Sequence, residues 1–188
     1  MLELIQKSLK KSPVIKKNNY YYFINPLTDG IPSIEPELLQ EITSHIVKNT
    51  DMNVDKIVSI EAMGIPIGTS LSLKTGIPLS IIRKRKYGLD GETAVSQSTG
   101  YSKGELYING IENGDRVIVV DDVISTGGTL KSVIKALLNI GVTICNVVVI
   151  IERGEGVSEL REMNIDVKSI IKVNVDENGV SIKEVNGG

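Results

Sequence analysis

The chain has 188 residues, of which 41% are hydrophobic, so it fits one domain with a sizeable core rather than a disordered protein. Its formal net charge of -2 gives no reason to expect a nucleic-acid or membrane surface. A single cysteine, Cys145, excludes an intrachain disulfide, which favours a reducing and therefore cytoplasmic compartment. The longest apolar runs are strand-sized and fall well short of the roughly 20 residues of a membrane helix.

The first part of the chain predicts two helices around an extended segment. Leu2 to Lys10 has the pattern of a short amphipathic helix; the segment YYYFIN that follows is extended, with a turn in PLTDGIP. Glu35 to Lys48 carries apolar residues at the spacing of one helix face, and Pro36 suits its first turn.

The remainder of the chain alternates apolar strands with helices. We expect strands in KIVSIEA, IPLSIIRKRK, VIVV and ICNVVVIIE, then a short helix and a hairpin of SIIKVNV and GVSIKEV around DENG. One helix should follow KIVSIEA through Leu73, and another should span Thr129 to Leu138 and stop at Gly141. Val117 to Val120 lacks polar alternation, as in a parallel strand covered on both faces. The order predicts an α/β fold with a doubly wound, mostly parallel sheet.

The segment from Lys84 to Gly104 matches no regular element. It is rich in glycine and hydroxyl side chains and has little periodicity. Irregular loops of this length are usually functional lids or disordered linkers. Because this one lies inside the domain, between two strands, we expect a lid.

The stretch VIVVDDVISTGGTL, Val117 to Leu130, predicts a ligand site. In an open α/β sheet, ligands bind beyond the carboxyl ends of the strands, and Asp121 and Asp122 stand where this strand ends. Two adjacent carboxylates need donors or a cation, and the two hydroxyls of a ribose would supply donors. The acid pair therefore predicts contact with a sugar diol.

The residues that follow the acid pair suit a phosphate group. The glycines let the backbone approach a ligand, the free amides of a helix start attract a dianion, and the hydroxyls add donors. This phosphate loop comprises Ser125, Thr126, Gly127, Gly128 and Thr129. A surface turn with a helix cap is the plainer reading of an isolated TGG, but the order of strand, acids, loop and helix favours a site. The sequence contains neither a G-x-x-x-x-G-K-[ST] motif nor a G-x-G-x-x-G after a strand.

These residues carry a resemblance to a known family. VIVVDDVISTGGTL resembles the phosphoribosyl-diphosphate (PRPP) signature of type I phosphoribosyltransferases. EAMGIP, the block from RKRKYGLDGE to YINGIENGD, and VIIERGEG extend the resemblance over most of the chain. The chain looks like the purine branch, similar to adenine phosphoribosyltransferases and most similar to the archaeal-type hypoxanthine/guanine enzymes. The resemblance implies transfer of a 5-phosphoribosyl group from PRPP to a purine, with Mg2+ and release of pyrophosphate.

The resemblance also assigns roles to residues outside the signature. Ala62, Met63 and Gly64 match a pyrophosphate loop, although many adenine-specific relatives have an arginine where Met63 stands. The lid is implied to begin at Arg83, Lys84, Arg85 and Lys86 and to end at Tyr101, Ser102 and Lys103. The catalytic residues are then Asp121, Asp122 and Lys103. Mg2+ is expected to bind through PRPP rather than through a dedicated protein cluster.

The general base is left open. In adenine-specific relatives a glutamate precedes the tyrosine of the lid, whereas Gly100 stands at that position here. Glu92 and Glu105 are near in sequence, but neither is at the matching place.

The purine is expected to bind under a small hood. One domain is predicted over residues 1–188, with residues 1–35 and the segment after residue 152 contributing to that hood. Phe23, among three tyrosines, suits stacking on a purine, and Glu152 or Arg153 suits its exocyclic edge. A packing role for Phe23 and a surface ion pair for the other two are the alternatives.

The resulting hypothesis is a cytoplasmic purine-salvage enzyme that makes IMP or GMP, as a homodimer. Adenine phosphoribosyltransferase is the nearest alternative. A PRPP-sensing regulator is less favoured because the chain has no basic surface and too few residues before the sheet for a DNA-binding module. An orotate enzyme is disfavoured by the resemblance of YSKGELYINGIENGD to the purine branch.

Overall fold

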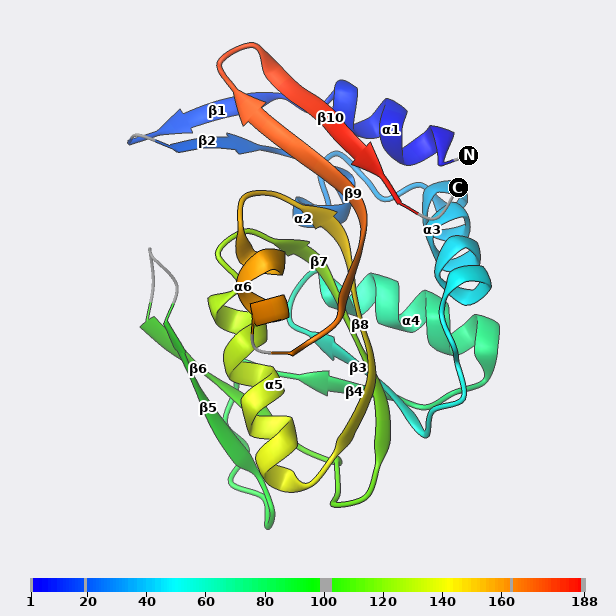
Figure 1. Ribbon diagram of the computed structural model, residues 1–188, viewed down its shortest axis with the longest axis vertical. Coiled ribbons are helices and arrows are strands. Elements are labelled where there is room, and N and C mark those ends of the chain that lie inside the picture. Colours follow the sequence, from blue (N-terminus) through cyan, green and yellow to red (C-terminus); the bar gives the residue numbers. More distant parts are fainter. Residues whose placement is uncertain (1, 19, 99–102, 163, 187–188) are drawn as a thin grey trace.

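A computed structural model describes residues 2–18, 20–98, 103–162 and 164–186 (Figure 1). No helix in these ranges combines the length and the apolar character needed to cross a membrane.

A six-stranded sheet forms the centre of the molecule, in the order β10-β9-β8-β7-β3-β4. Its strands are β3 (Lys56–Ile60), β4 (Leu79–Ile82), β7 (Arg116–Ile124), β8 (Thr143–Glu152), β9 (Val167–Asp176) and β10 (Gly179–Val185). All neighbouring pairs are parallel except β9 and β10, which form the expected antiparallel hairpin. The predicted doubly wound, mostly parallel α/β fold is confirmed.

Helices cover both faces of this sheet (Figure 1). They are α1 (Glu3–Lys10), α2 (Pro26–Asp29), α3 (Pro36–Asn49), α4 (Gly64–Thr75), α5 (Gly128–Ile140) and α6 (Gly156–Glu162). The apolar residues of α1, α3 and α4 pack with one face of the sheet in one core cluster. Those of α5 and α6 pack with the other face in a second cluster. Side chains of β7 are divided between the two: Ile118 lies in the first and Val119 in the second.

The segment PLTDGIP, expected as a turn, contains the single-turn helix α2. Asn25 caps it by accepting a hydrogen bond from the backbone of Leu27 at 3.0 Å, and Pro26 occupies the first turn, where its missing N–H costs nothing. The Asn25 amide also donates to Ser8 and Ser12, both at 2.9 Å. These bonds tie α2 to the end of α1.

The expectation that residues 84–104 contain no regular element is wrong. The strands β5 (Thr93–Ser98) and β6 (Lys103–Ile108) form an antiparallel hairpin, in which Val95 pairs with Leu106. Both side chains are buried in the core cluster that includes α5. This packing stabilises a pair of strands whose sequences show little periodicity by themselves. The preceding strand β4 also ends earlier than expected, at Ile82.

Two hairpins and α1 lie together at one end of the molecule (Figure 1). The hairpin of β1 (Val14–Lys17) and β2 (Tyr20–Phe23) is antiparallel, and β2 contacts β9. We call this region, together with α2 and Arg153, the hood; it combines segments from both ends of the chain.

Candidate active site

The acid pair lies in the last part of β7, within the strand rather than after it. Asp121 and Asp122 are both half-buried, and the backbone N–H of Asp122 donates to Oδ1 of Asp121 at 3.1 Å. Burial raises the pKa of Asp121 to about 6. Burial and then the charge of Asp121 raise the pKa of Asp122 well above its usual value. The pair therefore favours a ligand that brings donors or a cation.

The phosphate loop joins the end of β7 to the start of α5. Gly127 has φ +73°, a conformation that favours glycine, and a Cβ placed there would lie 3.1 Å from the carbonyl oxygen of Gly156. The backbone N–H of Gly156 donates to the carbonyl of Ser125 at 2.9 Å. The segment after β8 therefore braces this loop, while the first amides of α5 lie at its end.

The expected pyrophosphate loop, residues 62–64, joins β3 to α4 beside the acid pair. A Cβ on Gly64 would lie 3.1 Å from Oδ1 of Asp121 and 3.2 Å from the carbonyl oxygen of Val120. The methyl group of Met63 approaches Gly30, directly after α2. A side chain at this position would therefore require the acid pair or the backbone of β7 to shift by a few tenths of an ångström.

A cavity of about 420 Å³ opens beside the acid pair and the phosphate loop. Its walls combine β2, α2, the end of β7, the start of α5 and the residue after β8. The lining residues are Tyr20, Tyr22, Phe23, Thr28, Asp29, Asp121, Val123, Ile124, Ser125, Thr126, Gly127, Gly128, Thr129, Leu130 and Arg153. The structure thus brings Phe23, Asp121, the whole phosphate loop and Arg153 to one cavity.

Aromatic and cationic groups form the hood side of this cavity. The guanidinium of Arg153 lies 3.9 Å from the centre of the Tyr20 ring, within the range of a cation–π contact. The Tyr20 hydroxyl and Oγ of Ser125 are 3.2 Å apart. Tyr20 therefore links the residue after β8 to the phosphate loop.

Four lining residues of the hood were not assigned to the site from the sequence: Tyr20, Tyr22, Thr28 and Asp29. The tyrosines carried a signal, because aromatic residues cluster around Phe23. Thr28 and Asp29 carried none, because they stand in a segment expected to be a plain turn. Oδ2 of Asp29 accepts hydrogen bonds from the Asn25 backbone at 3.0 Å and from the Thr28 hydroxyl at 2.6 Å.

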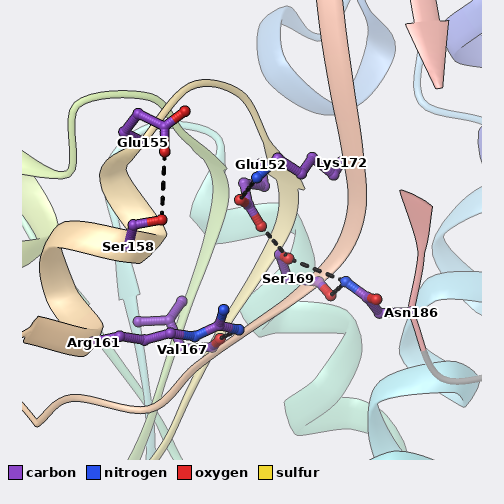
Figure 2. A network of polar contacts seen from close by, with 8 residues as sticks. All are labelled: Glu152, Glu155, Ser158, Arg161, Val167, Ser169, Lys172 and Asn186. Carbon is purple, nitrogen blue, oxygen red and sulfur yellow. Dashed lines mark hydrogen bonds and ion pairs between the residues drawn. The ribbon is translucent and has the colours of Figure 1, made fainter. Parts of the chain in front are cut away.

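Glu152 precedes Arg153 but its carboxylate lies at a different cavity. Ser169 Oγ donates to Oε2 of Glu152 at 2.5 Å, and Nζ of Lys172 lies 2.8 Å from Oε1 (Figure 2). Glu152 lines a second cavity, of about 410 Å³, together with Ser169 and Lys172. Of the two adjacent residues expected at the purine edge, only Arg153 lines the cavity beside the acid pair.

The basic run expected at the start of a lid lies next to the expected pyrophosphate loop. Nε of Arg83 donates to Oε2 of Glu61 at 2.6 Å, and the backbone of Lys84 donates to the same oxygen at 3.2 Å. The hydrogen bond from Arg83 lowers the pKa of the Glu61 carboxyl. Lys84, Arg85 and Lys86 are exposed. Tyr101, Ser102 and the position of Gly100 lie outside the described residues, and so does the side chain of Lys103, whose backbone begins β6.

Comparison with known proteins places this site in a family. A model of the phosphoribosyl transferase domain matches residues 34–184. The chain is 80% identical over 188 residues to a hypoxanthine/guanine phosphoribosyltransferase of Methanohalobium evestigatum, covering 100% of this chain and 99% of that protein. It is 60% identical over 187 residues to the enzyme of the same name from Methanohalophilus mahii, covering 100% of this chain and 98% of that protein.

Solved structures agree on the fold. Adenine phosphoribosyltransferase from Thermoanaerobacter pseudethanolicus superposes with a TM-score of 0.75 at 22% identity, over 92% of this chain and 99% of that chain. The Saccharomyces cerevisiae adenine enzyme, in complex with an imino-altritol bisphosphate and adenine, gives a TM-score of 0.73 at 19% identity, over 90% and 99% of the two chains. The predicted resemblance to phosphoribosyltransferases is therefore confirmed, and the chain belongs to the phosphoribosyl transferase domain family.

Proposed function

We propose that this chain is a purine-salvage enzyme that transfers the 5-phosphoribosyl group of PRPP to hypoxanthine or guanine. The products are IMP or GMP and pyrophosphate. The observation that carries this proposal is the single cavity in which Asp121, the phosphate loop and the hood residues meet. The names of relatives that share 56% to 80% of their residues with this chain support the choice of purine.

The cavity suggests how the ribose 5-phosphate part of PRPP binds. The carboxylates of Asp121 and Asp122 accept hydrogen bonds from the ribose hydroxyls, and each such charge-assisted bond contributes about 1.5–3 kcal/mol. The amides at the start of α5 and the hydroxyls of Ser125, Thr126 and Thr129 bind the 5-phosphate. The reacting sugar is thereby held across the carboxyl end of β7.

The leaving pyrophosphate is assigned to residues 62–64 and to the lid. Charge builds on pyrophosphate as the anomeric C–O bond breaks, so cations near it stabilise the transition state more than the bound substrate. Lys103 is proposed to supply one such cation, and Arg83 to Lys86 others. Closure of residues 84–104 would exclude water, which competes with the purine as acceptor.

The acid pair also fits a magnesium complex of PRPP. Its carboxylates are half-buried and their pKa values are raised, so a nearby cation would favour their charged forms. Mg2+ prefers oxygen ligands and often binds through substrate phosphates with few protein ligands. When bound, the ion would neutralise part of the negative charge on the diphosphate.

The hood residues offer the groups that an oxopurine needs. Tyr20 and Tyr22 supply apolar faces for stacking, and Arg153 supplies donors for the carbonyl at C6. Phe23 lines the same cavity but is only 8% exposed, because most of its ring packs in the core. Asp29 is an acceptor, and N1–H of hypoxanthine or guanine is a donor. Adenine lacks that carbonyl and carries no hydrogen at N1, so it matches this donor–acceptor set less well.

A panel of bases tests the proposal. Hypoxanthine, guanine, adenine, xanthine and orotate are each incubated with PRPP and Mg2+, and the nucleotides are then analysed. We expect IMP and GMP in excess over AMP. AMP as the main product would favour the adenine alternative, and no nucleotide with any base would favour a non-catalytic PRPP-binding protein.

A homodimer in the cytoplasm completes the proposal. The resemblance to the family supports the homodimer, and the single cysteine supports a reducing compartment. Light scattering coupled to gel filtration should give twice the chain mass of 20.4 kDa.

A further inference from the structure

Glu152 is a buried acid at the last position of β8, directly before Arg153. The residue is only 5% exposed. Val148 and Ile150, which precede it at alternate positions, belong to the core cluster that contains α3 and α4. Glu152 therefore continues the face of β8 that packs against α3 and α4, whereas Arg153 lines the active-site cavity.

Two groups hold this carboxylate in place, and a third bonds to one of them (Figure 2). Ser169 Oγ donates to it at 2.5 Å, and Lys172 forms an ion pair with it at 2.8 Å. Both partners belong to β9, and Lys172 is the residue that pairs with Glu152 in the parallel register. The amide of Asn186 donates to the carbonyl of Ser169 at 3.0 Å and to its hydroxyl at 3.3 Å. We call Glu152, Ser169 and Lys172 the β8 clamp.

The chain beyond the clamp enters the active site at once. The backbone N–H of Arg153 donates to the carbonyl of Ile124, the last residue of β7, at 2.9 Å. The Arg153 guanidinium lies on the Tyr20 ring, and Tyr20 contacts Ser125 of the phosphate loop. The direction in which Arg153 leaves the sheet therefore depends on where the clamp fixes the end of β8.

We propose that Glu152 is a positioning residue, whose bonds to Ser169 and Lys172 hold Arg153 in the orientation that binds the purine base. This inference rests on the proposed function, in which Arg153 faces the base. Glu152 itself touches neither base nor PRPP. Without Lys172, a buried carboxylate loses its neutralising partner, and the strand end must shift to let water reach it.

The matched control is a second ion pair that lies far from the base. Nζ of Lys56 lies 2.6 Å from Asp115, where β3 begins and just before β7 begins. Its two side chains are 24% and 16% exposed, against 34% and 7% for Lys172 and Glu152. The two pairs thus stand at opposite ends of the parallel strands, and the Glu152 carboxylate is the less exposed of the two.

The first experiment compares Lys172→Met with Lys56→Met. Both should lower the melting temperature. Only Lys172→Met should raise KM for hypoxanthine, by about tenfold, with KM for PRPP within about twofold of wild type. A hypoxanthine KM that changes no more than in Lys56→Met would overturn the proposal, because the clamp would then be a stabilising contact only.

A double-mutant cycle tests whether the clamp acts through Arg153. Arg153→Met alone should raise the hypoxanthine KM, and adding Lys172→Met should raise it little further, since both changes remove the same interaction. Independent, multiplied effects would contradict the proposal. Lys172→Arg keeps the cation and should leave the hypoxanthine KM within about twofold of wild type.

Failure of the clamp proposal is distinguishable from failure of the proposed function. If the wild-type protein forms no IMP or GMP, the function is wrong whatever the variants do. If the wild-type protein is active but the clamp variants match their control, only the clamp proposal is wrong.

If Lys172→Met does not fold, Glu152→Gln replaces it in the experiment, because a glutamine at this position leaves no buried carboxylate without a partner. That variant should raise the hypoxanthine KM at least about fivefold, and an unchanged KM would overturn the proposal.

Discussion

The proposed role of Asp122 in binding the ribose would come at a cost to the free protein. Its carboxylate is half-buried beside Asp121, and burial raises its pKa. No described cation neutralises it: the ion pairs of the described ranges involve Glu61, Asp115 and Glu152 instead. The site therefore stores electrostatic repulsion that binding of PRPP with Mg2+ would relieve.

Asp122→Asn should separate stability from activity. We expect kcat/KM to fall by about a hundredfold or more, because a charge-assisted contact to the ribose is lost. The melting temperature without ligand should be equal to or higher than that of the wild type, since a repulsive buried charge is removed. Steady-state kinetics and calorimetry on the same preparation check both. Near-normal turnover would count against the role of Asp122 in binding the ribose.

The pKa of Asp121 predicts how stability depends on pH. Its folded value of about 6 lies above the ordinary value of 3.8, so the folded state binds the proton more tightly between these values. The resulting stabilisation is complete below about pH 4 and is lost as the pH rises through 6. Urea unfolding measures the free energy of unfolding of the free wild type and of Asp121→Asn at pH 4 and at pH 7. Between pH 4 and pH 7 this free energy should decrease less in the variant than in the wild type. Parallel decreases would contradict the raised pKa.

At the scale of elements, the site depends on connections between strands and helices. The phosphate loop joins β7 to α5, and the pyrophosphate loop joins β3 to α4; a parallel sheet places both at the same edge. The segment after β8 braces the phosphate loop through the bond from Gly156 to Ser125. Three neighbouring strands thus contribute one connection each.

Gly127 tests the phosphate loop, with Gly76 as its control. Both residues have φ +73°, so alanine should cost each a similar strain, about 1 kcal/mol. A Cβ at Gly76 has nothing within 4 Å, whereas one at Gly127 would lie 3.1 Å from the carbonyl of Gly156. Gly127→Ala should therefore raise KM for PRPP several-fold, and Gly76→Ala should not. Equal PRPP kinetics would argue against the phosphate assignment.

At the scale of the whole molecule, the proposed lid gives a protease test. The basic run from Arg83 to Lys86 is followed by exposed residues and then by the β5–β6 hairpin, which packs on α5. Trypsin cleavage within residues 84–104 should slow at least about threefold when PRPP and Mg2+ are added, because closure reduces local opening. PRPP without Mg2+ is the control. The same cleavage rate in all conditions would argue against a lid.

The sequence by itself determined the mostly parallel sheet, the glycine-containing connection from β7 to α5, and the family. These features are local: buried parallel strands are continuously apolar, and strand, acids, glycines and helix follow one another in VIVVDDVISTGGTL. Helix limits were predicted within a few residues for the same reason, as the agreement of Glu35–Lys48 with α3 shows.

Only the tertiary structure decided how distant segments meet. The β5–β6 hairpin is stabilised by Val95 and Leu106 on α5, a contact between segments far apart in the chain. Thr28 and Asp29 reach the cavity because α2 contacts β7, which lies far from it in the chain. Glu152 and Arg153 are adjacent in sequence yet serve different cavities, because β8 ends at Glu152, where β9 supplies the partners of its carboxylate, and Arg153 lies in the connection that follows.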